Sequence, residues 1–390
     1  RVDIDYTYFD DTTDPRITYT NPLGLVTTVR FGFFSGKRKP VLIEKQGSEG
    51  VPESAVSMGY DEEGFLISRA DEAGNVTTYT RDNLGREISR TEGLGEIEER
   101  IITTSWDEGS QKPALITTSL NQEIFTYDSE GRLLTQTLSS SDGTQTWTYA
   151  YNNEGLLESI DGPRGDLNDI TTYQYDNDGN LQRTINALGH EIQYSNYHYS
   201  GQPQRIIDAN GVVSNLSYNW RGLITQTVIE HPSGEASLNS TLIYDYDDVG
   251  RVSRQTRSNG SFLQYEYNNA NYVTAIVNEL GERQEMEYDL AGNVTSTQYL
   301  DNLGSTVFSL YQSFNALNQV TQTNTGAGVI TNQSYYPNGE IQSTTDGRQN
   351  ATQYTYDSLN RIATVLDAGQ GTTSFQYDEQ DRITSVTDAN

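Results

Sequence analysis

Three histidines and many aspartates are the residues of this sequence that could support catalysis or metal binding. His190, His198 and His231 lie in turn or insertion contexts, and their spacing is not that of a metal site. Serine and aspartate residues are plentiful, but none forms the nucleophile elbow that a Ser-His-Asp hydrolase requires. We therefore expect no catalytic residue, no resident cofactor and no metal site, and we do not expect the chain to be an enzyme.

Acidic turns offer a second kind of chemistry, because carboxylate oxygens are the ligands that calcium prefers. Two examples are Asp176-Asn177-Asp178-Gly179 and Asp245-Tyr246-Asp247-Asp248. The twelve-residue spacing of an EF-hand is absent, and turn geometry already accounts for aspartate at these positions. Calcium binding stays open, without assigned ligands.

The aspartates of these turns belong to a unit that recurs along the chain. Aromatic or equivalent anchors, many of them 21 residues apart, begin fourteen copies. The anchors are Tyr60, Arg81, Tyr127, Tyr151, Tyr175, Tyr197, Tyr218, Tyr246, Tyr267, Tyr288, Phe314, Tyr335, Tyr356 and Tyr377. Self-similarity at such a period is typical of repeat architectures, in which each copy is one supersecondary unit.

The residues after each anchor predict a hairpin turn. The next position is Asp in eight copies and Asn in four, and the fourth position after the anchor is Gly in ten and Asn or Asp in the rest. Asp or Asn can open a tight turn, and Gly, Asn or Asp tolerates a left-handed backbone at its end. This pattern is typical of a type I turn with a G1 bulge, which we expect at residues 128–131, 247–250 and 357–360.

Large apolar residues flank the turns at spacings of two, which predicts strands on both sides of each turn. Stacked hairpins would align these residues into ladders along a sheet. We assign a structural role to the anchor, the Asp, the left-handed residue and the following Arg of the best copies. These are Tyr127, Asp128, Gly131, Arg132, Tyr246, Asp247, Gly250, Arg251, Tyr288, Asp289, Gly292, Tyr356, Asp357, Asn360, Arg361, Tyr377, Asp378 and Arg382.

Five arginines complete the motif, namely Arg86, Arg132, Arg251, Arg361 and Arg382. They could form a row that binds a cargo. We favour a structural interpretation, in which they pair with neighbouring repeat aspartates or stack on the tyrosine ladder.

Composition favours a thin acidic structure. Hydrophobic residues are only 34% of 390, and the net charge is −29. A surface of this charge is a poor partner for nucleic acid and anionic membranes. There is no cysteine, no apolar run long enough to span a membrane, and no signal-peptide pattern at the N-terminus.

The repeat predicts one all-β array over residues 1–390, with degenerate copies in 1–59 and clear copies in 60–390. We expect about 17 stacked hairpins that form a solenoid or spiral, one sheet deep and open at both ends. Such a strip would hold about one turn of a curved wall. The final Asp388-Ala389-Asn390 stops where the comparable Asp208-Ala209-Asn210 continues into Gly211, so we expect a fragment of a larger protein.

The motif resembles the Tyr-Asp (YD) or Rhs repeat, as in Tyr127-Asp128-Ser129-Glu130-Gly131-Arg132 and Tyr246-Asp247-Asp248-Val249-Gly250-Arg251. The resemblance implies a spiral of hairpins that forms the wall of a hollow shell, as in bacterial Rhs toxins, insecticidal toxin complexes and animal teneurins. In the bacterial members the shell encloses a toxic C-terminal polypeptide, which a core segment at the end of the shell releases. Asp14-Pro15 and Asn21-Pro22-Leu23-Gly24-Leu25 share some letters with that segment, but we interpret them as repeat turns and assign no autoproteolytic aspartates.

The resemblance implies a non-catalytic shell segment that protects a toxin domain of the same polypeptide. Other components of a secretion or toxin complex are further implied partners, and the expected location is outside a bacterial cell or on its surface. One alternative is a module that binds carbohydrate or cell surfaces, because aromatic hairpin repeats also build choline- and glucan-binding solenoids. A β-propeller hydrolase fits less well, since a 21-residue unit holds two strands and a blade needs four.

Overall fold

The computed structural model describes residues 5–9 and 14–388. Within them the regular structure is β-strand, apart from one three-residue 3-10 helix, Ala236–Leu238. Each strand pairs antiparallel with the next one in the sequence, so 34 strands form a single continuous sheet. The prediction of an all-β array of about 17 hairpins is confirmed.

The strands, in chain order, are β1 (Asp5–Phe9), β2 (Arg16–Thr20), β3 (Val26–Phe34), β4 (Lys37–Lys45), β5 (Ser54–Tyr60), β6 (Leu66–Ala70), β7 (Val76–Arg81), β8 (Glu87–Glu92), β9 (Arg100–Trp106), β10 (Pro113–Thr117), β11 (Gln122–Tyr127), β12 (Leu133–Ser140), β13 (Gly143–Tyr151), β14 (Leu157–Asp161), β15 (Thr171–Tyr175), β16 (Leu181–Ile185), β17 (Glu191–Tyr197), β18 (Pro203–Ile207), β19 (Val213–Tyr218), β20 (Ile224–Ile229), β21 (Ser240–Tyr246), β22 (Val252–Arg257), β23 (Phe262–Tyr267), β24 (Val273–Asn278), β25 (Arg283–Tyr288), β26 (Val294–Leu300), β27 (Thr306–Phe314), β28 (Val320–Thr325), β29 (Ile330–Tyr335), β30 (Ile341–Asp346), β31 (Ala351–Tyr356), β32 (Ile362–Leu366), β33 (Thr372–Tyr377) and β34 (Ile383–Thr387).

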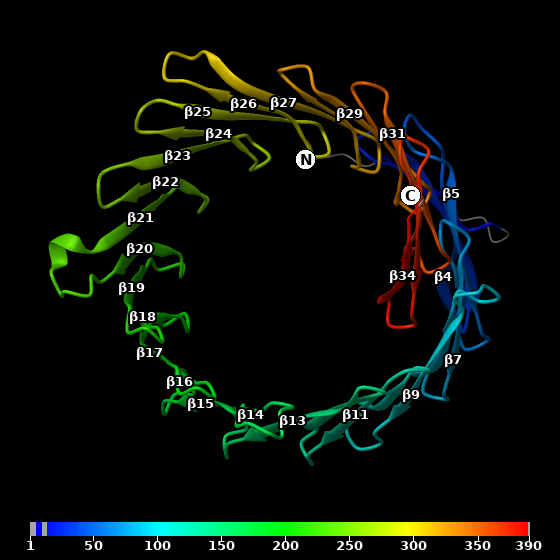
Figure 1. Ribbon diagram of the computed structural model, residues 1–390, viewed down its shortest axis with the longest axis horizontal. Coiled ribbons are helices and arrows are strands. Elements are labelled where there is room, and N and C mark those ends of the chain that lie inside the picture. The colour runs from blue at the N-terminus through cyan, green and yellow to red at the C-terminus, as the bar shows by residue number, and fades with distance from the viewer. Residues whose placement is uncertain (1–4, 10–13, 389–390) are drawn as a thin grey trace.

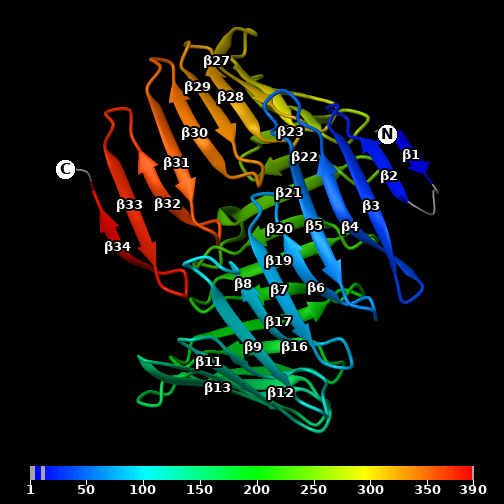
Figure 2. The same cartoon turned by 90° about the vertical axis from the view of Figure 1, so that its right-hand side faces the viewer.

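The sheet curves around an open centre through slightly more than one turn (Figure 1). Its last strands, β31–β34, therefore come to lie beside the first part of the array, as the view in Figure 2 also shows. The strip is thus a spiral wall whose second turn has just begun.

The wall has almost no core. Among the described residues, no large side chain is fully buried. The buried hydrophobic residues are Leu25, Val51, Val56, Ile102, Ala275 and Ala316. A single sheet with solvent on both faces leaves most side chains half-buried, which accounts for the low apolar content of the sequence.

The hairpin turns have the predicted geometry. In the turn after β11, the Gly131 amide donates to the Asp128 carbonyl at 3.0 Å, and the Asp128 amide donates to the Arg132 carbonyl at 2.9 Å. Gly131 is left-handed with φ of 75°, and Asn360 fills the same position in its copy with φ of 61°. At the base of this turn the register shifts, so that Tyr127 pairs with Leu133 while the preceding Thr126 pairs with Thr135.

Two kinds of turn alternate along the strip. Turns that carry the Tyr-Asp motif follow odd-numbered strands, and the returning turns, such as 71–74 and 278–281, follow even-numbered strands. In an antiparallel meander this places all motif turns on one edge of the sheet and all return turns on the other. We call these the YD edge and the return edge.

The degenerate first part of the chain has the same architecture. β3 and β4 form one long hairpin there, and β9 and β10 form a similar hairpin farther along the chain. The register of each shifts near its proline, Pro40 in the first and Pro113 in the second, as expected for proline at bulges.

The described residues include no helix that is long and apolar enough to cross a membrane. Of the last three residues, Ala389 and Asn390 lie outside the described part.

Candidate functional site: the Tyr-Asp turn and the seam of the spiral

The aspartate of each motif organises its turn. Asp247 Oδ1 accepts hydrogen bonds from the backbone amides of Val249, Gly250 and Arg251 at 2.9 to 3.1 Å. The Arg251 amide, and then its side chain, lower the pKa of Asp247 below the usual value, against an opposing effect of burial. The turn is therefore stabilised by the ionised carboxylate.

Each motif arginine forms an ion pair with the aspartate of its own turn. In the second copy of the YD-x-x-G-R pattern, Arg251 Nε lies 2.6 Å from Asp247 Oδ2. The other pairs, at 2.6 to 2.8 Å, are Arg86–Asp82, Arg132–Asp128, Arg361–Asp357 and Arg382–Asp378. The expected pairing with a neighbouring repeat is seen for Arg361, whose Nη1 also lies 2.9 Å from Asp381 Oδ1 in the next copy.

Four of these arginines also stack on the aromatic residue that ends the first strand of the following hairpin. The Arg251 guanidinium carbon lies 4.3 Å from the centroid of the Tyr267 ring. The same contact joins Arg86 to Trp106, Arg132 to Tyr151 and Arg361 to Tyr377. One arginine thus closes its own turn and covers the next tyrosine, so the motif couples consecutive hairpins.

The anchor tyrosines couple the hairpins a second time, through their hydroxyl groups. Tyr267 donates to the backbone carbonyl of Val252, in the preceding hairpin, at 2.7 Å. Equivalent bonds to the preceding copy are made by Tyr127, Tyr151, Tyr175, Tyr197, Tyr218, Tyr246, Tyr288, Tyr335, Tyr356 and Tyr377. Burial raises the pKa of Tyr267, so its hydroxyl stays protonated, and can donate, to a higher pH than the hydroxyl of a free tyrosine.

Sequence reasoning treated the anchors as apolar residues and missed this bond. A signal was available, because Arg81 and Trp106 also carry a donor, and Trp106 ends β9 as the anchor tyrosines end their strands. Arg81 Nε donates to the Leu66 carbonyl at 2.9 Å, and Trp106 Nε1 donates to the Glu87 carbonyl at 2.8 Å. What these two residues share with tyrosine is a polar hydrogen at the end of a large side chain.

The copy at Tyr288, Asp289 and Gly292 has no arginine. Asn293 occupies the arginine position, and its Nδ2 donates to Asp289 Oδ2 at 2.8 Å. The turn is therefore closed by an amide where other copies use a guanidinium, and Gly292 keeps the left-handed conformation with φ of 91°.

The two turns of the spiral meet along a seam, where the YD edge of the last hairpins lies on the return edge of the first. The seam holds a cluster of buried apolar residues, made of Leu25, Val51 and Ala316, with Leu23 and Leu317 packed against it. Next to it, Asn21 Nδ2 donates to the Ala316 carbonyl at 2.5 Å. Within the described residues, buried apolar side chains thus gather where the two turns of the spiral meet.

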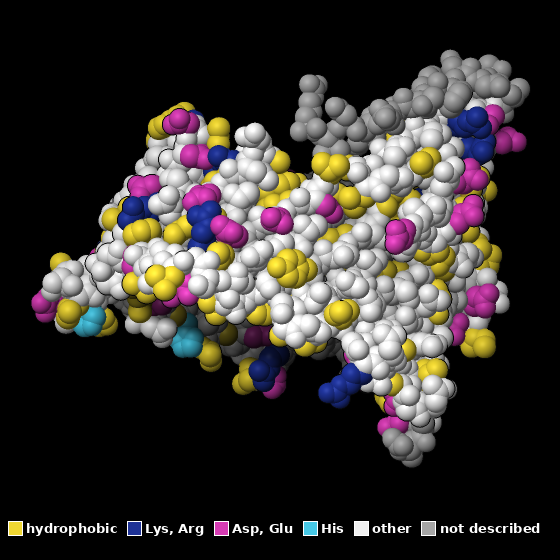
Figure 3. Space-filling view, turned by 90° about the horizontal axis from the view of Figure 1, so that it is seen from above, with side chains coloured by type: hydrophobic (Ala, Val, Ile, Leu, Met, Phe, Trp, Pro, Cys, Tyr) yellow, Lys and Arg dark blue, Asp and Glu magenta, His cyan; other side chains and the backbone are white. Residues whose placement is uncertain are grey.

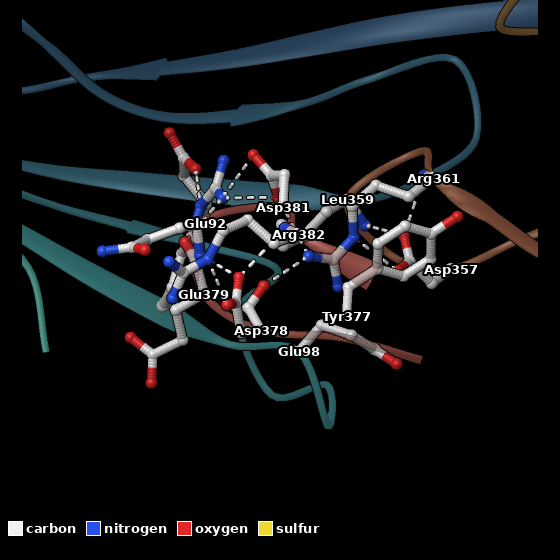
Figure 4. Close-up of polar contacts among 12 residues, drawn as sticks. Glu92, Glu98, Asp357, Leu359, Arg361, Tyr377, Asp378, Glu379, Asp381 and Arg382 are labelled. Carbon is white, nitrogen blue, oxygen red and sulfur yellow. Dashed lines mark hydrogen bonds and ion pairs between the residues drawn. The ribbon is translucent and has the colours of Figure 1, made fainter. Parts of the chain in front are cut away.

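Farther along the seam the contacts are polar. Asn360, left-handed in its motif turn, donates to Asp71 at 3.1 Å and accepts from Asn75 at 3.1 Å. Arg100 Nη1 lies 3.0 Å from Asp381 Oδ1, which also receives Arg361. Figure 4 shows Asp381 in this network, close to the Asp357–Arg361 pair and the Tyr377 ring. Asn360 and Asp381, which replace glycine in their motif turns, therefore both make contacts across the seam.

The three histidines take part in local turns. His198 Nδ1 lies 2.6 Å from Ser200 Oγ, and His231 Nδ1 lies 2.8 Å from Ser233 Oγ. His190 Nδ1 lies 3.4 Å from Asn186 Nδ2. The described part of the chain brings no three His, Cys, Asp or Glu side chains together in a group that could hold a metal.

In Figure 3 acidic and basic side chains are spread over the visible face and do not gather in one patch.

Comparisons with known proteins agree with this geometry. The Teneurin YD-shell family model matches residues 110–302, and the RHS Repeat model matches residues 60–97 and 362–390. A search of curated proteins found no match.

Solved structures of toxin complexes have the same fold. A TcdB2-TccC3-TEV crystal structure matches with a TM-score of 0.59 at 14% identity, over 98% of this chain and 24% of the other. The Photorhabdus luminescens Tc holotoxin pore matches with a TM-score of 0.59 at 13% identity, over 95% of this chain and 24% of the other. The chain thus spans about a quarter of the length of these structures.

The repeated motif, the hairpin spiral and the two matching family models agree with one another. The chain belongs to the YD-repeat, or RHS-repeat, family.

Proposed function

We propose that this chain is a structural segment of a YD-repeat shell, which encloses a toxic polypeptide of the same protein and shields it until delivery. The observation that supports the proposal is the curved wall. It is one sheet thick, and after one turn its last hairpins contact its first hairpins along the seam. Such a strip separates an inside from an outside with little material. The matches to toxin-complex structures support the fold of this wall.

In this proposal the segment has no catalytic role, and the motif residues act mechanically. Asp and Arg hold each turn, while Arg and Tyr fasten each hairpin to the next. The partner is the enclosed polypeptide, with other components of a toxin or secretion complex around the shell. We place the protein outside a bacterial cell or on its surface, and the net charge of −29 argues against nucleic acid and anionic membranes as partners.

The test is limited proteolysis of the full-length gene product, followed by mass spectrometry of the peptides released. If the shell encloses a polypeptide, peptides from that polypeptide should appear late in the wild type. They should appear early in an Asn21→Ala, Arg100→Glu variant, whose seam is weakened. An Ile124→Thr variant, altered on an exposed strand position away from the seam, should behave like the wild type. Equal cleavage in all three proteins would contradict enclosure.

Glycan binding is the second candidate, and one observation favours it. Tyr199 and Trp220, both about three-quarters exposed, lie in consecutive motif turns, and the Tyr199 hydroxyl donates to the Trp220 carbonyl at 2.5 Å. Neighbouring exposed aromatic rings are a surface on which sugars can stack. Binding on a glycan array that a Trp220→Ala substitution removes would support this function over the shell alone.

A further inference from the structure

Tyr272 stands where other copies of the motif have arginine. It follows the left-handed Asn271 in the turn between β23 and β24, so it occupies the position that Arg132 and Arg251 occupy in their own turns. Its ring also takes over the contact that those guanidinium groups make, because it lies on the anchor of the next copy, Tyr288. Two phenol rings therefore meet where other copies place a cation on a ring.

The two rings form a close stack. The centroids of the Tyr272 and Tyr288 rings lie 4.9 Å apart, and the ring planes are inclined by 20°. The rings of Tyr336 and Tyr356 are also in contact, but their centroids lie 6.0 Å apart and their planes are inclined by 87°. A nearly parallel stack lets the carbon atoms beside the two hydroxyl groups approach each other, whereas a perpendicular pair turns the edge of one ring to the face of the other. The first pair is therefore the better placed for a bond between rings.

The surrounding residues hold both tyrosines in place. The Tyr288 hydroxyl donates to the Val273 carbonyl at 2.6 Å. The Tyr272 amide donates to Asn268 Oδ1 at 3.0 Å, and the Asn268 amide donates to the Tyr272 carbonyl at 2.9 Å. A Cβ added at Gly292 would collide with the Tyr272 hydroxyl, so this glycine leaves room for the second phenol. The stack is thus built from two consecutive hairpins and needs no other part of the chain.

We infer that Tyr272 and Tyr288 are a site of oxidative modification, at which a peroxidase and hydrogen peroxide join the two rings as dityrosine. Each phenol gives up one electron and its hydroxyl proton and becomes a phenoxyl radical. The two radicals form a carbon–carbon bond between the ring carbons beside their oxygens, and the hydrogen on each of these carbons moves to the oxygen, which restores both phenols. The electrons and protons removed reduce one hydrogen peroxide to two waters.

This bond fastens one hairpin covalently to the next. It joins positions 272 and 288, in the β23–β24 turn and at the end of β25, and the chain has no cysteine with which a disulfide could do the same. A cross-link within one chain stabilises the fold mainly by restricting the unfolded chain. The inference does not rest on the proposed enclosure of a polypeptide, because the stack is a property of the wall alone.

Oxidation of the dilute wild-type protein by peroxidase and hydrogen peroxide, followed by peptide mass spectrometry, tests the inference. The peptides that contain Tyr272 and Tyr288 should appear joined, with the mass of their sum less two hydrogens, and the monomer should acquire dityrosine fluorescence. Met286 is a competing target, since its sulfur lies 3.9 Å from the Tyr288 hydroxyl oxygen, but its oxidation adds oxygen and is separated by mass. The Tyr336–Tyr356 pair is the internal comparison and should be joined several-fold less.

Tyr272→Arg is the matched variant, because it places the usual guanidinium on the Tyr288 ring. It should fold like the wild type and lose the cross-link at Tyr288. Tyr299→Phe removes a tyrosine outside the pair that is 44% exposed, and it should keep the cross-link. Oxidation should raise the thermal midpoint of the wild type and of Tyr299→Phe, and it should not raise that of Tyr272→Arg.

Three results would overturn the inference. The first is a wild type in which Tyr272 and Tyr288 stay unjoined, or are joined mainly to other tyrosines. The second is cross-linking of the Tyr336–Tyr356 pair that is as efficient as that of the stacked pair. The third is dityrosine fluorescence of equal strength in Tyr272→Arg and the wild type.

Discussion

Arg100 and Asp381 lie 281 residues apart in the sequence, yet Arg100 Nη1 is 3.0 Å from Asp381 Oδ1. The pair joins the first turn of the spiral to the beginning of the second. Asp381 stands in the left-handed position where most copies have glycine, with φ of 62°. Its side chain thus gives the last described hairpin a contact that a glycine could not make.

The first prediction concerns this pair. Asp381→Gly relieves a left-handed backbone but removes the contacts with Arg100 and Arg361, so we expect β33 and β34 to exchange their amide hydrogens faster. Arg100→Gln should have a similar effect, of about 0.5 to 1 kcal/mol, because the carboxylate is half exposed. Hydrogen exchange followed by mass spectrometry measures both. A double mutant whose effect equals the sum of the two singles would show that the residues are not coupled.

The second prediction concerns the tyrosine hydroxyls. Tyr267→Phe removes the donor to the Val252 carbonyl and should lower the free energy of unfolding by about 0.5 to 1.5 kcal/mol. Phe314 is the one aromatic anchor among the clear copies without a polar hydrogen, so Phe314→Tyr is the reverse experiment and should stabilise the array. Denaturant titrations of the two variants compare them directly. Equal stability of Tyr267→Phe and the wild type would mean that this bond adds nothing to the fold.

The third prediction concerns the left-handed turn residue. Gly131→Val should destabilise the array by about 1 to 2 kcal/mol or more, because a β-branched residue resists positive φ. A side chain at this position has room, since the nearest atom to an added Cβ is Ser110 Cβ at 3.5 Å. Gly131→Asn is therefore the control, and its thermal midpoint should stay near that of the wild type. If both variants melt at the same temperature, backbone strain is not the cause.

Local and long-range features differ in how far they could be predicted. The hairpins follow from turn chemistry and side-chain alternation within a few residues, and Gly131 and Asn360 have the expected conformation. The partners of Asn360 could not be predicted, because Asp71 is brought to it by curvature accumulated over 25 strands. Asn360→Gly would relieve the left-handed backbone of this turn. The seam contacts indicate that this substitution removes hydrogen bonds.

The fourth prediction is a stability profile with losses at both extremes of pH. Hydrogen bonds lower the pKa of turn aspartates such as Asp176 and Asp247, so their contribution is complete above about pH 4 and is lost as the pH falls through the lowered values. Burial raises the pKa of anchor tyrosines such as Tyr267 and Tyr335, so their contribution is complete below about pH 10 and is lost as the pH rises through the raised values. Thermal midpoints between pH 2 and 12 measure the profile. A midpoint that stays constant across this range would contradict both assignments.

Small-angle X-ray scattering tests the central claim, that the chain is a hollow spiral wall. One turn of 25 strands spaced about 4.8 Å apart and tilted by about 40° gives a ring of about 25 Å in radius, and hence a radius of gyration of about 26 Å. The measurement should use a dilution series, so that the monomer is observed. The account predicts this value together with a distance distribution that is broadened by the open centre. A radius of gyration near 21 Å, which compact packing gives for 390 residues, with a single symmetrical distance peak would contradict it.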